Sequence, residues 1–182
     1  SPSPSPSPSP SPSHPQDTVA AASESIAEIG SLLGPAAFAP LAPKLVEIAI
    51  SLLTQTHPCM HDAEAAEGDG LDEEADHDGS LWEAVSDLLT ALPKVMGQGW
   101  LLHFAKLVPA LLPYLTAGHP ASDRSLAIGV LAESLHQLGE CGAAYFHQIL
   151  PHAIRCSQDL DDVTTRQNGT FCLGVLGQFG GP

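Results

Sequence analysis

The stretch Gly97-Gln-Gly-Trp-Leu-Leu-His-Phe-Ala-Lys-Leu-Val-Pro109 returns in altered form as Gly139-Glu-Cys-Gly-Ala-Ala-Tyr-Phe-His-Gln-Ile-Leu-Pro151. Glycine, phenylalanine and proline keep their places in both copies, which are 42 residues apart. Gly181 follows Gly139 by the same 42 residues, and Arg166 follows Arg124 by 42 residues as well. Periods of roughly 40 to 47 residues are typical of two-helix HEAT and armadillo repeats. The sequence therefore predicts an array of helix pairs.

Apolar residues spaced three and four positions apart indicate helices before, within and after these two stretches. They predict helix pairs at residues 17–54, 80–117 and 122–156, followed by a single helix at 162–179. Aromatic residues make up only 5% of the chain, which also favours packed helices over a sheet. We therefore expect an all-α fold, a HEAT/armadillo-type α-solenoid in which each antiparallel pair covers the apolar face of the next.

Polar residues that can cap a helix stand at three of the expected helix starts. Asp17 precedes the first helix, and Ser122 precedes the third pair. Ser80 and Glu83 form a capping box, in which each side chain can bond the backbone amide of the other, so the second pair should begin there. The first helix is expected to bury Val19, Ala22, Ile26, Ile29 and Leu33.

Two segments do not follow the helical pattern. Residues 1–16 form a Ser-Pro low-complexity tail, which should be disordered because a residue before proline avoids helical backbone angles. Residues 55–79 are an acidic insertion, expected to be an exposed and largely disordered loop because a helix would place like charges side by side. Residues 17–182 otherwise form the solenoid. Its last helix lacks a partner, which suggests a fragment of a longer array.

The charge of the chain is strongly negative, with 21 Asp and Glu against 6 Lys and Arg and a formal net charge of -15. Nucleic acids and anionic membranes require basic surfaces, so we expect no direct nucleic-acid binding and no membrane insertion. Basic proteins are the natural partners. The candidate contact residues, which we call the acidic segment, are Asp62, Glu64, Glu67, Asp69, Asp72, Glu73, Glu74, Asp76 and Asp78. The alternative is a solvated spacer, because exposed charges are screened over roughly 8 to 10 Å.

Patterns for catalysis or cofactor binding are missing from the sequence, so we expect no enzyme and no cofactor. His57, Cys59 and His61 are of metal-binding types, but they lack the paired spacing of a structural zinc site, and no metal is expected. Trp82 and Trp100 lie near the two ends of one expected helix and are interpreted as packing residues. The four cysteines are widely spaced, and we interpret them as reduced cysteines of an intracellular protein. They are Cys59, Cys141, Cys156 and Cys172.

Two stretches add a resemblance to a known family. Ser122-Asp-Arg-Ser-Leu-Ala-Ile-Gly-Val-Leu-Ala-Glu133, followed by Asp161-Asp-Val-Thr-Thr-Arg-Gln-Asn-Gly-Thr-Phe-Cys-Leu-Gly-Val-Leu176, resembles later HEAT repeats of the importin-beta family of nuclear transport receptors, and most of all its importin-4-like branch. The resemblance covers about residues 17–182. Members of that branch also carry an acidic insertion ahead of the helix that corresponds to Leu81 to Met96.

The resemblance implies a carrier that works in the cytoplasm and the nucleus. Such a receptor binds basic cargo, for instance core histones or ribosomal proteins, and releases it when Ran-GTP engages. The main Ran contacts of the family lie in N-terminal repeats that this chain lacks, so Ran-dependent release is expected only of the full-length protein. The alternative is a generic HEAT-repeat scaffold subunit of a multiprotein complex, which would dock tightly and without sensitivity to salt.

Overall fold

The computed structural model describes residues 15–60 and 71–180, and within these ranges the chain is helical and contains no strand. The elements are α1 (Pro15–Leu33), α2 (Pro35–Phe38), α3 (Ala42–Leu53), η1 (Pro58–Met60), α4 (Leu71–Met96), η3 (Gly97–Trp100), α5 (Leu101–Leu111), η4 (Leu112–Leu115), α6 (Ala121–Leu138), η5 (Gly139–Tyr145), α7 (Phe146–Ser157) and α8 (Val163–Phe179). The all-α prediction is therefore confirmed for the described residues.

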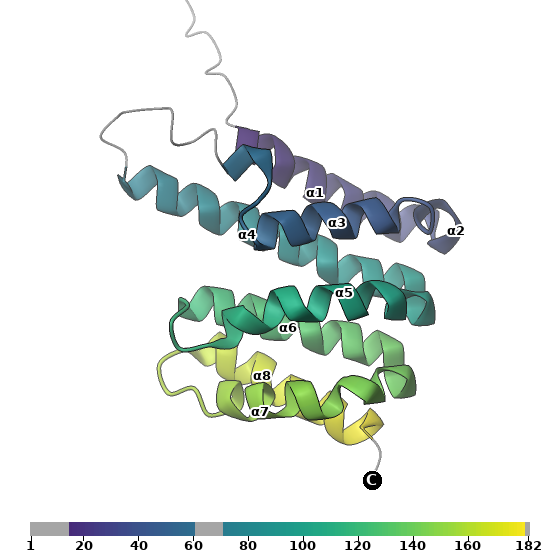
Figure 1. Ribbon diagram of the computed structural model, residues 1–182, viewed down its shortest axis with the longest axis vertical. Helices are drawn as coiled ribbons and strands as arrows, with labels where there is room; N and C mark the ends of the chain where they lie inside the picture. The colour runs from purple at the N-terminus through teal and green to yellow at the C-terminus, as the bar shows by residue number, and fades with distance from the viewer. Residues whose placement is uncertain (1–14, 61–70, 181–182) are drawn as a thin grey trace, which may run out of the picture.

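The helices lie in two rows (Figure 1). One row contains α1, α4, α6 and α8, and each of these helices packs on the next. The other row contains α3, α5 and α7, and each of them runs back antiparallel to the helix that precedes it (Figure 1). The predicted pairs correspond to α1 with α3, α4 with α5, and α6 with α7, and the predicted last helix is α8.

Two glycines of the 42-residue step turn the chain from one row to the other. Gly97 has φ 54° and Gly139 has φ 55°, a left-handed conformation that side chains disfavour. Each glycine ends a long helix and begins a 3-10 turn that leads into the returning helix, η3 before α5 and η5 before α7. The repeat seen in the sequence is thus a repeat of this backbone turn.

The core lies between the rows and was predicted well for the middle of the chain. The apolar residues that stand three and four positions apart in the second pair are all buried, namely Val85, Leu88, Leu89, Leu92, Phe104, Leu107, Leu111 and Leu115. Trp100 is also fully buried, and its Nε1 donates a hydrogen bond to Ser134 Oγ at 3.2 Å. The interpretation of Trp100 as a packing residue is therefore confirmed.

The span Leu81–Leu115 is long and apolar enough, by length and composition alone, to cross a membrane. It does not form one straight helix, because the chain reverses between α4 and α5 at Gly97 (Figure 1). Several apolar side chains of this hairpin, such as Leu89 and Phe104, are buried against neighbouring helices, whereas Leu102 is 77% exposed. Part of the apolar character of this span therefore belongs to the core of the helix stack.

Three helix starts differ from the prediction. The helix α1 begins at Pro15, two residues before Asp17. Proline suits a first helical position because an N–H at that position would have no partner within the helix, so its absence costs nothing. The helix α6 begins at Ala121, and Ser122 Oγ donates to Asp123 Oδ1 at 3.3 Å rather than capping the helix. The largest difference is α4, which begins at Leu71, so the Ser80 capping box was wrong and the end of the expected loop is helical.

The buried face of α1 also differs from the prediction. Ile29 and Leu33 are 47% and 62% exposed, whereas Gln16 and Ser23 are buried. The helix packs mainly on α4, with α2 and η1 at its ends, and these neighbours set which face is covered. Apolar spacing alone did not reveal that two polar residues lie on that face.

Candidate functional site

The acidic segment falls into two parts in the structure. Asp62, Glu64, Glu67 and Asp69 lie outside the described residues. Asp72, Glu73, Glu74, Asp76 and Asp78 lie in the N-terminal turns of α4, where a loop was expected. Acidic residues near a helix N-terminus are stabilised by the helix dipole, which offsets the repulsion between them. The helix also packs along α1. A helix therefore forms despite the charge run.

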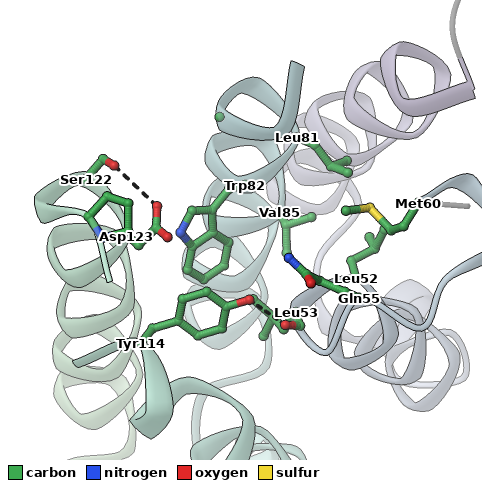
Figure 2. Close-up of a pocket in the computed structure, with 12 residues that line it drawn as sticks. Leu52, Leu53, Gln55, Met60, Leu81, Trp82, Val85, Tyr114, Ser122 and Asp123 are labelled. Atoms are coloured by element: carbon green, nitrogen blue, oxygen red, sulfur yellow. Dashed lines mark hydrogen bonds between the residues drawn. The ribbon is translucent and has the colours of Figure 1, made fainter. Parts of the chain in front are cut away.

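A cavity of about 270 Å³ lies directly after this part of α4 (Figure 2). Its walls come from the end of α3 and η1, the middle of α4, and the connection from η4 to α6. The lining residues are Leu52, Leu53, Gln55, Met60, Gly79, Leu81, Trp82, Val85, Tyr114, Pro120, Ser122 and Asp123. The cavity thus joins segments that lie up to 71 residues apart in sequence, from Leu52 to Asp123.

An aromatic pair forms one wall of the cavity. The rings of Trp82 and Tyr114 lie 5.0 Å apart between centroids, and the Tyr114 ring lies 4.7 Å from that of His119. The Tyr114 hydroxyl donates a hydrogen bond to the Leu53 carbonyl and so ties the second helix pair to the first. The Trp82 Nε1 atom is buried and has no hydrogen-bond partner among the described residues. Figure 2 shows this nitrogen on the side of the indole that faces Asp123.

The carboxylate of Asp123 supplies negative charge to the same wall. Its Oδ2 atom lies 3.8 Å from His119 Nδ1, and the Asp123 side chain is 22% exposed. Burial raises the pKa of Tyr114, and the nearby negative charge of Asp123 raises it further. Among the described residues, no Lys or Arg lines the cavity, so none of them places a permanent cation there to balance the charge of Asp123.

The next junction along the stack, between α6 and α8, is fastened by an arginine instead. Arg124 donates to the Asp159 carboxylate at 2.8 Å and to the His119 carbonyl at 2.7 Å. The Asp159 carboxylate also accepts the backbone amide of Asp162 at 2.9 Å, and this bond, followed by the one from Arg124, holds the pKa of Asp159 below its ordinary value. Arg166 donates to the Asp159 carbonyl at 2.6 Å.

Further polar contacts hold α8 against α6. Asp162 caps α8 by accepting the Thr165 amide at 2.5 Å, which lowers the pKa of Asp162. The Thr165 hydroxyl donates to the Ala121 carbonyl at 3.1 Å. The side-chain amide of Asn168 donates to the Ser125 carbonyl at 3.0 Å. The start of the last helix near Asp162, expected from the sequence, is therefore confirmed.

The cavity and this network occupy the same place in successive helix pairs. Trp82 stands 42 residues before Arg124 and 84 before Arg166, so a tryptophan takes the position that arginine holds in the two later pairs. The packing interpretation of Trp82 accounts for its ring but not for its unpartnered nitrogen. The signal in the sequence that could have singled out Trp82 as more than a packing residue was its spacing of 42 and 84 residues from Arg124 and Arg166.

The remaining residues singled out in the sequence do not form a second site. Within residues 15–60 and 71–180, no group of three or more His, Cys, Asp or Glu side chains could hold a metal ion. His57 Nδ1 lies 3.0 Å from Cys59 Sγ, while His61 lies outside the described residues. Cys59, Cys156 and Cys172 are buried and Cys141 is exposed, and none of these four cysteines forms a disulfide bond within the described part of the chain.

These features describe a class: an all-α chain of stacked helix pairs with an acidic edge and an adjoining cavity. No protein-family model matches the chain. Over 109 residues, 59% of its length, the chain is 30% identical to Importin-4 from Homo sapiens. The corresponding identity with Importin-4 from Mus musculus is 29% over 109 residues. The chain spans about a tenth of the length of these curated relatives, and the similarity supports a relationship to the importin-beta family.

Proposed function

We propose that this chain is part of a nuclear import receptor, built as a HEAT-type α-solenoid, and that it binds basic protein cargo. The observation that carries the proposal is the acidic segment, with nine carboxylates in 17 residues, in a chain similar to Importin-4. Five of these acids stand on the first turns of α4, beside a cavity that adds a further carboxylate, Asp123. Negative potential concentrated in this way attracts Lys-rich and Arg-rich partners and raises their association rate.

The proposal includes the wider properties of such receptors. The cargo class is basic protein, core histones and ribosomal proteins in particular. Release by Ran-GTP belongs to the full-length receptor, and the working compartments are the cytoplasm and the nucleus. The chain acts by binding and not by catalysis. The helical stack supports this role because its rows of helices present extended surfaces on which a partner can lie.

The test is a charge-neutralised variant that keeps α4 in place. Asp72, Glu73, Glu74 and Asp76 are replaced by Asn or Gln, and binding to a core-histone complex is measured at low and at physiological salt. If each exposed ion pair contributes about 0.4 kcal/mol, four together contribute about 1.6 kcal/mol, and affinity should fall more than about tenfold at low salt. The difference should shrink at physiological salt because screening weakens exposed pairs.

A matched control separates position from net charge. Four acids at exposed positions elsewhere, Glu24, Glu28, Asp87 and Glu140, are neutralised in the same way. Affinity should then change by less than about threefold, since these acids are spread over the described surface. Equal loss in both variants would show attraction by net charge alone. Tight binding with an affinity that neither set of substitutions nor the salt concentration changes would favour the scaffold alternative.

A further inference from the structure

We propose that the cavity beside Trp82, Tyr114 and Asp123 is a lysine pocket: it holds one lysine side chain of a basic polypeptide partner. The inference rests on the proposed function and deepens it, because it assigns one cargo side chain to one place on the surface. It follows from the shape of the cavity, its charge, the unpartnered indole nitrogen and the contacts that Asp123 already makes with Ser122 and His119.

The walls of the cavity suit the hydrocarbon part of a lysine. Leu52, Leu53 and Val85 are buried residues that present aliphatic groups, and Met60 adds a flexible thioether. Lysine buries its four-carbon stem along such surfaces while its ammonium group seeks polar partners. At about 270 Å³ the cavity has room for this side chain together with part of the backbone that carries it.

The charged end of a lysine finds acceptors on two walls. Asp123 stands on one side and the side-chain amide of Gln55 is directed into the cavity from the other (Figure 2). The indole of Trp82 lies between them in this view, with the ring of Tyr114 beside it, and a cation near an aromatic face is favoured. With no Lys or Arg in the lining, the negative charge of Asp123 is available to a cation from outside.

The Trp82 nitrogen indicates that the ligand is a polypeptide rather than a small amine. Its N–H is buried and faces the Asp123 side of the cavity without an acceptor among the described residues. A buried donor that lacks an acceptor is unfavourable, so a ligand that supplies one gains affinity. Less than 1 Å² of this nitrogen is exposed, so the indole must shift towards the cavity for the bond to form. An ammonium group cannot accept a hydrogen bond, but the backbone carbonyl next to a bound lysine can.

The bonds of Asp123 favour lysine over arginine. Its Oδ1 accepts a bond from Ser122 Oγ at 3.3 Å, and its Oδ2 lies 3.8 Å from His119 Nδ1. A guanidinium binds a carboxylate best through two parallel bonds to both oxygens, and that geometry is obstructed here. A compact ammonium needs only one free direction on the carboxylate.

The acidic turns of α4 lead directly into this pocket. Gly79 and Leu81 belong to its lining, and Asp72 to Asp78 precede them on the same helix. The acidic segment would therefore concentrate any basic chain without distinguishing its residues, whereas the pocket would select lysine. This division of roles makes the two contributions separable by experiment.

The test compares two labelled peptides of equal charge, ten lysines and ten arginines, by fluorescence anisotropy. Wild-type chain should bind the lysine peptide about threefold or more tightly than the arginine peptide. Asp123→Asn should weaken lysine binding about tenfold and leave arginine binding within about twofold. The control Asp87→Asn, on an exposed position of α4 outside the lining, should leave both unchanged. Thermal unfolding of each variant shows that it is folded.

A second readout does not depend on Asp123. The lysine peptide should shift the tryptophan emission of the wild-type chain, and Trp82→Phe should abolish the shift because Trp100 is buried elsewhere in the core. If Asp123→Asn leaves the lysine preference intact and the emission does not respond, the lysine pocket is wrong. The proposed function still stands in that case if neutralising Asp72, Glu73, Glu74 and Asp76 weakens both peptides equally. If the neutralised variant binds both peptides as tightly as the wild-type chain does, both proposals are overturned.

Discussion

Replacing Gly169 by alanine tests how closely the last two helices pack. A Cβ atom at this position would lie 2.4 Å from the backbone nitrogen of Ser157 and 2.6 Å from the carbonyl carbon of Cys156. Both atoms belong to the backbone of α7, so no side-chain rotation can relieve the contact, and α8 must move away by about 1 Å to reach ordinary van der Waals distance.

The expected cost follows from two opposing terms. Overpacking a core costs about 1–3 kcal/mol, and a contact with backbone belongs at the upper end of that range. Alanine is a better helix former than glycine by about 1 kcal/mol, which offsets part of the cost. The net loss should be about 2 kcal/mol. In a chain of this size that corresponds to a melting temperature about 4–8 °C lower, measured by circular dichroism or calorimetry.

The same helix provides the control. Gly174 lies in α8 and is exposed, and a Cβ atom there meets nothing within 4 Å. Gly174→Ala should therefore stabilise the chain by up to about 1 kcal/mol through helix propensity alone. If Gly169→Ala proves as stable as Gly174→Ala, the close approach of α7 and α8 described above is refuted.

Three further measurements address other contacts. Tyr114→Phe removes the bond to the Leu53 carbonyl and should lower the free energy of unfolding by about 1 kcal/mol in a denaturant titration. The raised pKa of Tyr114 means that the folded chain holds this proton more tightly, so stability should fall as pH rises above about 10, an effect that Tyr114→Phe should remove. The pKa of Asp159 is lowered in the folded chain, so its contribution to stability should be present above about pH 3.9 and lost as pH falls through the folded pKa. Asp159→Asn should therefore lower the melting temperature near neutral pH and weaken the dependence of the melting temperature on pH in acid. Alkylation of the native chain followed by mass spectrometry should label exposed Cys141 first, whereas Cys172, whose pKa burial raises to about 12, should react only after unfolding.

The sequence was most informative where one physical requirement repeats. Gly97 and Gly139 recur because each turn needs a left-handed residue. Apolar spacing agrees with the buried positions of the middle pair, such as Leu89 and Phe104, because both flanks of this pair are covered by neighbouring helices. The period and the helix order could therefore be predicted without a structure.

The errors arose where packing outweighs local preference. The early start of α4 at Leu71 depends on contact with α1, which no local pattern reveals. The burial of Gln16 and Ser23 likewise depends on which face of α1 meets its neighbours. The cavity depends on how the end of α3, η1 and the connection from η4 to α6 converge on α4 beside Trp82. Only the 42-residue register indicated that this residue replaces an arginine.

The junction between α4 and α6 is held differently at its two edges. At the edge near the Gly97 turn, Trp100 bonds Ser134 at 3.2 Å and Lys94 lies 3.7 Å from Glu133. At the opposite edge the cavity stands where the next junction has Arg124. Apolar and aromatic surfaces can slide past each other, whereas directional bonds resist sliding. When the stack flexes, this junction should hinge about its bonded edge, so that bending of the molecule widens or narrows the mouth of the cavity.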